Sequence, residues 1–78
     1  MQREFYLKNS EYIALNDLLK AMHLVGTGGE ANIRISNGEV LLNGEVETQK
    51  RKKIRPGDHV EFNEIRITVY RIINSSVF

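Results

Sequence analysis

The spacing of apolar residues changes along the 78-residue chain, and each change predicts a different element. Near the beginning, Phe5 and Leu7 alternate with polar residues, which is typical of a short strand with one buried face. Further on, apolar residues stand at positions i, i+3, i+4 and i+7, which predicts a helix from residue 15 to about residue 24. The residues of this helix that we expect to face the core are Leu15, Leu18, Leu19 and Met22.

A glycine-rich turn follows the first predicted helix. Within residues 26–30, the sequence GTGGE, Thr27 precedes Glu30 by three positions, which is the spacing of a capping box. In this motif the hydroxyl of the first residue accepts a hydrogen bond from the amide of the fourth, and the carboxylate of the fourth accepts one from the amide of the first. A second short helix is therefore predicted to begin here, to bury Ala31 and Ile35, and to end at Asn37-Gly38.

The second half of the chain has the period of two that is typical of strands. Val40 and Leu42 precede Asn43-Gly44, a strong signal for a tight hairpin turn, and Val46 begins the return strand. A turn at residues 56–58, the sequence PGD, leads into two strands that we expect to pair as a hairpin. From these patterns we predict a frayed end over residues 74–78 and a core that includes Leu18, Leu19, Val40, Leu42, Val60 and Ile67.

The length and composition limit the kinds of function. We expect residues 1–78 to form a single domain with a thin core, because a chain of this size buries little apolar surface. The absence of cysteine excludes disulfides, thiolate metal sites and cysteine nucleophiles, and it fits a reducing compartment. The sequence contains neither an apolar run long enough to cross a membrane nor the pattern of a signal peptide. We therefore expect a cytoplasmic location and no membrane partner.

The charged residues are distributed unevenly along the chain. The formal net charge is only +1, yet residues 50–55, the sequence KRKKIR, contain five of the 11 basic residues. A positive segment on a nearly neutral chain indicates a polyanionic partner that approaches in one orientation. Three other interpretations remain open, namely a solvated loop, a docking site for an acidic protein and a nuclear import signal. The import signal is the weakest of these because the segment lies inside the predicted fold.

No group of residues points to catalysis, a metal site or a small-molecule substrate. His23 and His59 are far apart and have no neighbouring ligand at metal-binding spacing, and no serine has the context of a nucleophile. The glycine-rich turn lacks the third glycine of a dinucleotide site and the lysine of a P-loop. Its amides either receive one phosphate of a polymer or form an ordinary helix start. We therefore expect no catalytic residue, no metal and no cofactor.

The order of these motifs resembles that of the S4 RNA-binding domain, also called the alpha-L motif. The resemblance spans about residues 10–63 and rests on four segments of the chain. They are LNDLLK at 15–20, TGGEA at 27–31, NGEVLLNGEVET at 37–48 and KIRPGDHV at 53–60. More narrowly, the chain is similar to the small stand-alone bacterial branch of this family.

This resemblance implies an α+β fold in which two short helices pack on a small bent, mostly antiparallel sheet. It implies non-enzymatic binding of structured RNA, such as ribosomal or transfer RNA, and an association with ribosomal particles. The aromatic residues, Tyr12 among them, do not recur at strand spacing, so the sequence predicts contacts with phosphates and with the shape of the RNA and no base-stacking platform. The implied contact residues are Thr27, Gly28, Gly29, Asn32 and Arg34 in the second helix, and Lys50, Arg51, Lys52, Lys53 and Arg55 in the basic loop.

Two positions depart from the family pattern. Asn32 stands where lysine is common, and Ala14 stands where a hydroxyl commonly caps the first helix. Asn32 and Arg34 are both expected to be exposed on the second helix. They form one surface with the basic loop only if that loop packs beside the helix. The alternative function is a protein-interaction adaptor that docks an acidic partner through the basic loop.

Overall fold

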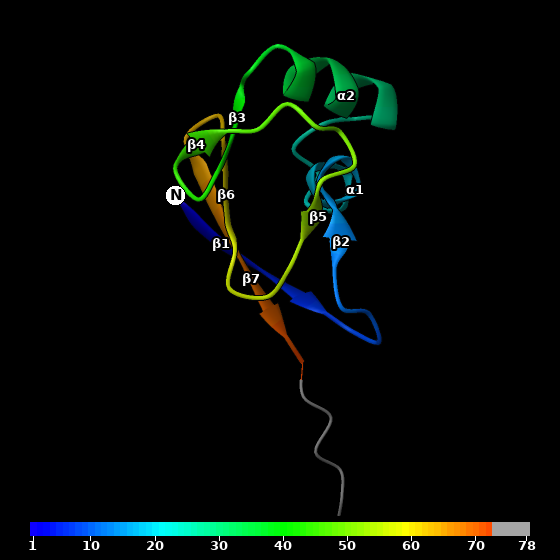
Figure 1. Cartoon of the computed structure of the whole chain (residues 1–78), viewed down its shortest axis with the longest axis vertical. Coiled ribbons are helices and arrows are strands. Elements are labelled where there is room, and N and C mark those ends of the chain that lie inside the picture. The colour runs from blue at the N-terminus through cyan, green and yellow to red at the C-terminus, as the bar shows by residue number, and fades with distance from the viewer. Residues whose placement is uncertain (73–78) are drawn as a thin grey trace, which may run out of the picture.

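The computed structural model describes residues 1–72, which form two helices, a main sheet and a separate pair of short strands (Figure 1). The helices are α1 (Leu15–Ala21) and α2 (Gly28–Ser36). The strands are β1 (Gln2–Leu7), β2 (Ile13–Ala14), β3 (Val40–Leu42), β4 (Glu45–Val46), β5 (Lys53–Ile54), β6 (His59–Phe62) and β7 (Ile65–Arg71). The frayed end expected at residues 74–78 lies outside the described residues.

The main sheet has five strands in the order β1-β7-β6-β3-β4. β1 pairs with β7 in parallel, with Gln2 opposite Arg66, and the other neighbouring strands of this sheet are antiparallel. β2 and β5 form a separate antiparallel pair in which Ile13 lies opposite Ile54. The predicted fold class, two short helices with a mostly antiparallel sheet, is therefore confirmed.

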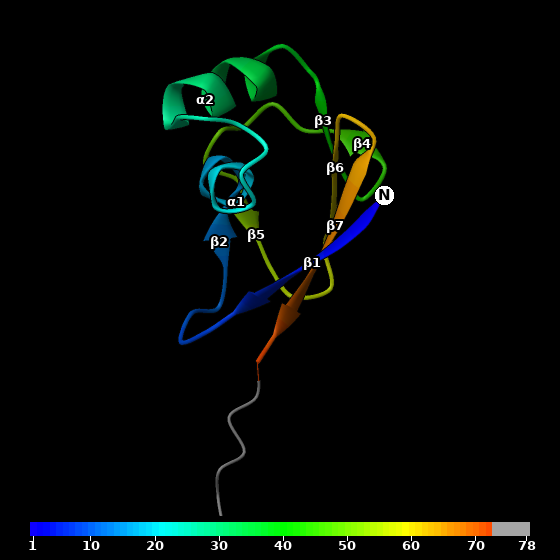
Figure 2. The same cartoon turned by 180° about the vertical axis from the view of Figure 1, so that it is seen from behind.

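Both helices and the β2–β5 pair lie on one face of the main sheet (Figures 1 and 2). Leu42 is only partly buried, contrary to the prediction, because it ends β3 beside the exposed Asn43-Gly44 turn. The predicted core residues that are completely buried are Leu18, Leu19, Val40, Val60 and Ile67. This core holds the helices and β5, with its basic neighbours, on the same side of the sheet.

The first helix ends earlier than predicted, at Ala21 instead of near residue 24. His23 adopts a left-handed φ of 59°, through which an α-helix cannot continue. The His23 amide donates to the Lys20 carbonyl and the Leu24 amide donates to the Leu19 carbonyl, both at 3.0 Å. These two bonds form a Schellman motif with histidine in the position that glycine usually occupies. The end of α1 therefore lacks the glycine by which the end of a helix is usually predicted from sequence.

Candidate nucleic-acid interface

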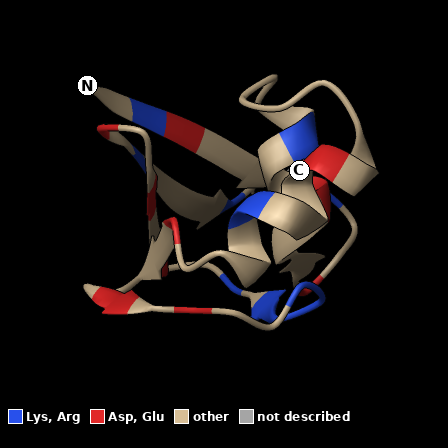
Figure 3. Ribbon diagram, turned by 90° about the horizontal axis from the view of Figure 1, so that it is seen from above, with Lys and Arg blue, Asp and Glu red and all other residues tan. Residues whose placement is uncertain are grey.

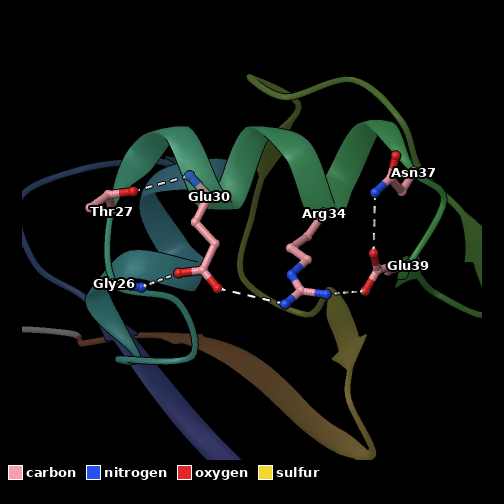
Figure 4. A network of polar contacts seen from close by, with 6 residues as sticks. All are labelled: Gly26, Thr27, Glu30, Arg34, Asn37 and Glu39. Carbon is pink, nitrogen blue, oxygen red and sulfur yellow. Dashed lines mark hydrogen bonds and ion pairs between the residues drawn. The ribbon is translucent and has the colours of Figure 1, made fainter.

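The beginning of α2 is fixed by the side chains of Thr27 and Glu30 (Figure 4). The Thr27 hydroxyl accepts a hydrogen bond from the Glu30 amide at 3.1 Å, as the capping box predicts. The Glu30 carboxylate accepts from the Gly26 amide at 2.8 Å, and not from the Thr27 amide as predicted. The returning bond thus forms one residue before the cap, and it ties the glycine-rich turn to the helix.

Gly28 and Gly29 are the first two residues of α2, and because they have no side chains they do not cover its backbone amides. Neither has a positive φ, and a Cβ atom at Gly28 would meet nothing within 4 Å. A Cβ atom at Gly29 would meet the Thr27 hydroxyl oxygen at an ordinary 3.8 Å. The fold does not require glycine at either position. Glycine even destabilises a helix by up to about 1 kcal/mol relative to alanine, so a reason other than folding is needed for its presence. They give close access to the first amides of α2, where the helix dipole favours an anion.

Arg34 is exposed, as expected, but it is already paired with two carboxylates (Figure 4). Its guanidinium lies 3.1 Å from Glu39 Oε1 and 3.8 Å from Glu30 Oε2. Asn37 donates a further hydrogen bond to the second oxygen of Glu39 at 3.4 Å. These acids offset the positive charge of Arg34, which makes it a weaker candidate for a phosphate contact than its position on α2 suggests.

The basic loop, residues 50–55, supplies the cap that α1 lacks. Ala14 makes no capping hydrogen bond with its side chain, as expected. Instead, the Leu15 amide donates to the Lys52 carbonyl at 2.9 Å and the Asn16 amide donates to the Lys50 carbonyl at 3.0 Å. Two of the orphan amides of α1 are satisfied in this way. The backbone of the loop is consequently fixed against the beginning of α1.

Asn16 connects the basic loop with α2, although no sequence pattern singled it out. Its side chain is almost fully buried, with 9% of the residue exposed. Its Nδ2 donates to Asn32 Oδ1 at 3.0 Å, and its Oδ1 accepts from Arg51 Nη1 at 3.3 Å. Asn32 is therefore partly buried and not exposed as predicted, because it packs against α1. Through this residue the loop and α2 are neighbours, which is the arrangement that a continuous surface needs.

The positive charge of the loop is largely free of acidic partners. Among residues 1–72, Arg51 pairs with Asp17 at 3.3 Å, and the other four loop cations have no carboxylate within salt-bridge distance. A surface hollow of about 340 Å³ is lined by Gln49, Arg51, Lys52, Lys53 and Arg55. Figure 3 shows the blue of the loop concentrated at the lower right, while the lower left carries red segments. The loop therefore forms a localised positive surface.

Tyr12 is a second residue of this surface that the sequence patterns did not identify. Lys53 Nζ lies 4.9 Å from the centroid of its ring and Arg55 Cζ lies 5.8 Å from it, within the range of cation–π contacts. Tyr12 immediately precedes β2, and the pairing of β2 with β5 brings it beside the loop. Because each of these strands has only two residues, their pairing leaves no periodic pattern in the sequence.

Other parts of the described structure do not form a competing site. Within residues 1–72, no three His, Cys, Asp or Glu side chains are grouped so that they could hold a metal ion. The charged side chains that line a hollow of about 600 Å³ away from the loop are those of Glu39, Glu61, Glu64 and Arg66, and this excess of acids disfavours a polyanion. In the part of the chain that the structure describes, no helix has the length and apolar character needed to cross a membrane.

Known proteins share both the sequence pattern and the fold. The family model described as the S4 domain matches residues 5–70. YbcJ of Escherichia coli (strain K12) is 41% identical over 58 residues, which cover 74% of this chain and 83% of YbcJ. YbcJ of Shigella flexneri matches with the same identity and coverage. A solution structure of YbcJ from E. coli, described as revealing an alpha-L motif involved in RNA-binding, has a TM-score of 0.67 and 37% identity. The match covers 86% of this chain and 85% of that one.

Proposed function

Because this chain belongs to the S4 domain family, as the order of its motifs predicted, we propose that it is a non-enzymatic RNA-binding protein. The observation that carries the proposal is the Asn16 side chain, which bonds to both Arg51 of the basic loop and Asn32 of α2. We infer from this link that the loop cations without an acidic partner and the beginning of α2 act as one RNA-binding surface. The RNA-binding motif described for YbcJ supports the same function.

In the proposed complex, RNA phosphates contact two parts of this surface. The loop cations without an acidic partner attract the RNA backbone, and the amides of Gly28 and Gly29 donate to one phosphate. Thr27 caps the helix that presents these amides, and Asn16 keeps the two parts together through its bonds to Arg51 and Asn32. Phosphate contacts orient an RNA without reading its bases, and helical RNA is recognised mainly by its shape. We therefore propose structured RNA as the ligand, with ribosomal or transfer RNA as the class, ribosomal particles as a partner and the cytoplasm as the location.

A direct binding experiment separates RNA from an acidic protein as the partner. A labelled ribosomal RNA hairpin is titrated with the full chain and followed by fluorescence anisotropy, with polyglutamate as the unlabelled competitor. We expect a Kd below about 10⁻⁶ M at physiological salt, tighter than ordinary non-specific binding, and weak competition by polyglutamate. Equal displacement of the probe by polyglutamate and by unlabelled hairpin, at the same concentration of negative charge, would favour the adaptor function.

Substitution of Gly29 tests the proposed phosphate contact at α2. Gly29→Asp is expected to weaken RNA binding by about fivefold or more, because two like charges about 4 Å apart cost about 1 kcal/mol even in water. The fold should remain intact, because the helix dipole favours a carboxylate in the first turn. Gly29→Ala is the control, since its Cβ has room, and it should bind close to wild type. Anisotropy titrations and thermal melting measure both properties; if the two variants bind RNA equally well, the glycine turn is only a helix start.

A further inference from the structure

Tyr12 is a large aromatic side chain that lies outside the core. It is 43% exposed and does not belong to the buried cluster. Its ring lies within cation–π distance of both Lys53 and Arg55. These two cations also line the hollow of about 340 Å³ in the basic loop. An exposed aromatic residue therefore contacts two of the cations that line this hollow.

The other exposed tyrosines of the described structure already have partners. The rings of Tyr6 and Tyr70 stack with their centroids 5.3 Å apart and their planes at 22°. The Tyr6 hydroxyl also donates to a carboxylate oxygen of Glu4 at 2.7 Å. Within residues 1–72, Tyr12 has no stacked aromatic neighbour and no hydrogen bond from its hydroxyl. Its ring contacts two cations of the basic loop, and the 43% of the residue that is exposed is accessible to a ligand that binds there.

We propose that Tyr12 stacks on an unpaired base of the bound RNA while Lys53 and Arg55 hold phosphates next to that base. Proteins commonly combine a positive groove that follows the nucleic-acid backbone with aromatic rings on which bases stack. Unpaired bases in loops and bulges of a folded RNA are available for such stacking, whereas bases inside a duplex are not. This inference rests on the proposed RNA binding, and it adds a preference for structured RNA that carries an unpaired base.

The first test compares RNA with a polyanion that has no bases. Tyr12→Leu is expected to weaken binding of a hairpin with an unpaired loop by about 5- to 150-fold, the range that corresponds to loss of one stacked base. Binding of inorganic polyphosphate should change far less, because the loop cations remain. Tyr12→Phe keeps the ring and should bind the hairpin as wild type does. Tyr6→Leu is the matched control, since Tyr6 is 47% exposed and lies outside the basic loop, and it should leave both affinities unchanged.

The second test observes stacking directly. The chain contains no tryptophan, so Tyr12→Trp introduces a single tryptophan fluorophore at the proposed stacking position. We expect the hairpin to quench its emission on binding, and we expect a fully paired RNA duplex and polyphosphate to leave it nearly unchanged. Quenching that follows the same binding curve as the anisotropy of the hairpin supports the inference.

The outcomes distinguish this inference from the proposed function. Equal losses for RNA and polyphosphate in Tyr12→Leu would overturn the stacking role, because the ring would then only orient the two cations. Unchanged hairpin affinity in Tyr12→Leu, with normal binding by wild type, would also overturn the inference and leave RNA binding in place. A wild-type chain that binds no RNA would overturn both.

Discussion

Replacement of Leu19 by alanine is expected to lower the free energy of unfolding by about 2–5 kcal/mol. The Leu19 side chain is completely buried in the core cluster, which contains residues of α1 and of the main sheet. Its truncation removes apolar contacts and leaves a cavity that the surrounding side chains fill only in part. A domain typically has a total stability of about 5–15 kcal/mol, and a small core lies at the lower end of this range. A loss of this size therefore removes a large fraction of the stability of the fold.

Ile33 provides the control for this experiment because it is an apolar helical residue outside the core. It is 61% exposed on α2, so Ile33→Ala should change the free energy of unfolding by less than about 0.5 kcal/mol. Urea denaturation followed by circular dichroism gives the free energy for wild type and both variants. Unfolding of the two variants at the same urea concentration would contradict the placement of Leu19 in the core.

The sequence predicts those elements whose signals are local. Thr27 and Glu30 predict the beginning of α2, and the Thr27 bond forms as predicted, while Glu30 accepts from Gly26 one residue before the cap. Asn43 and Gly44 both have a positive φ, 52° and 89°, as the two central residues of a tight hairpin turn require. Gly38, with a φ of 79°, follows the end of α2 as expected. Each of these signals depends only on residues that are close neighbours in the chain.

Features that depend on distant residues could not be predicted in this way. β1 pairs with β7, which joins Gln2 to Arg66 and thus connects opposite ends of the described chain. β2 and β5 have two residues each, too few for a periodic pattern, and they exist because Ile13 and Ile54 meet at the core. The end of α1 was placed too late because His23, and not glycine, adopts the left-handed conformation. In each case a tertiary contact or an unusual residue decides the structure.

The same distinction applies to the candidate site. The order of motifs along the chain indicated the beginning of α2 and the basic loop, but it could not establish that they are adjacent. That adjacency depends on Asn16, whose partners Asn32 and Arg51 are distant in the sequence. The spacing of Glu30 and Arg34 is that of a helical ion pair, so the sequence alone could have predicted that an acid offsets the charge of Arg34. The second acid on Arg34, Glu39, lies beyond the helix and follows from the fold alone.

Replacement of Lys50 and Lys52 by glutamine is expected to make RNA binding much less sensitive to salt. Each phosphate that a cation neutralises releases condensed counterions, so the logarithm of affinity falls linearly with the logarithm of salt concentration. The four loop cations without an acidic partner should give wild type a slope of roughly −2.8 to −3.6, at about 0.7–0.9 per phosphate contact. Loss of two contacts should flatten this slope by about 1.4–1.8. Anisotropy titrations of an RNA hairpin at several potassium chloride concentrations measure it.

Lys8→Gln with Lys20→Gln is the matched control, because it removes the same charge from exposed positions outside the basic loop. Net charge alone would affect the two double variants equally, whereas direct phosphate contacts affect only the loop variant. Both should fold, because none of the four lysines is buried and Lys52, the least exposed, is only partly buried. Solvent-accessible charges contribute little to stability, and glutamine leaves intact the Lys50 and Lys52 carbonyls that cap α1. The loop variant should also lose affinity for RNAs of different sequence to a similar extent, because phosphate contacts do not read bases. An unchanged slope in the loop variant would remove the basic loop from the RNA interface, and an acidic protein would then be the better candidate for its partner.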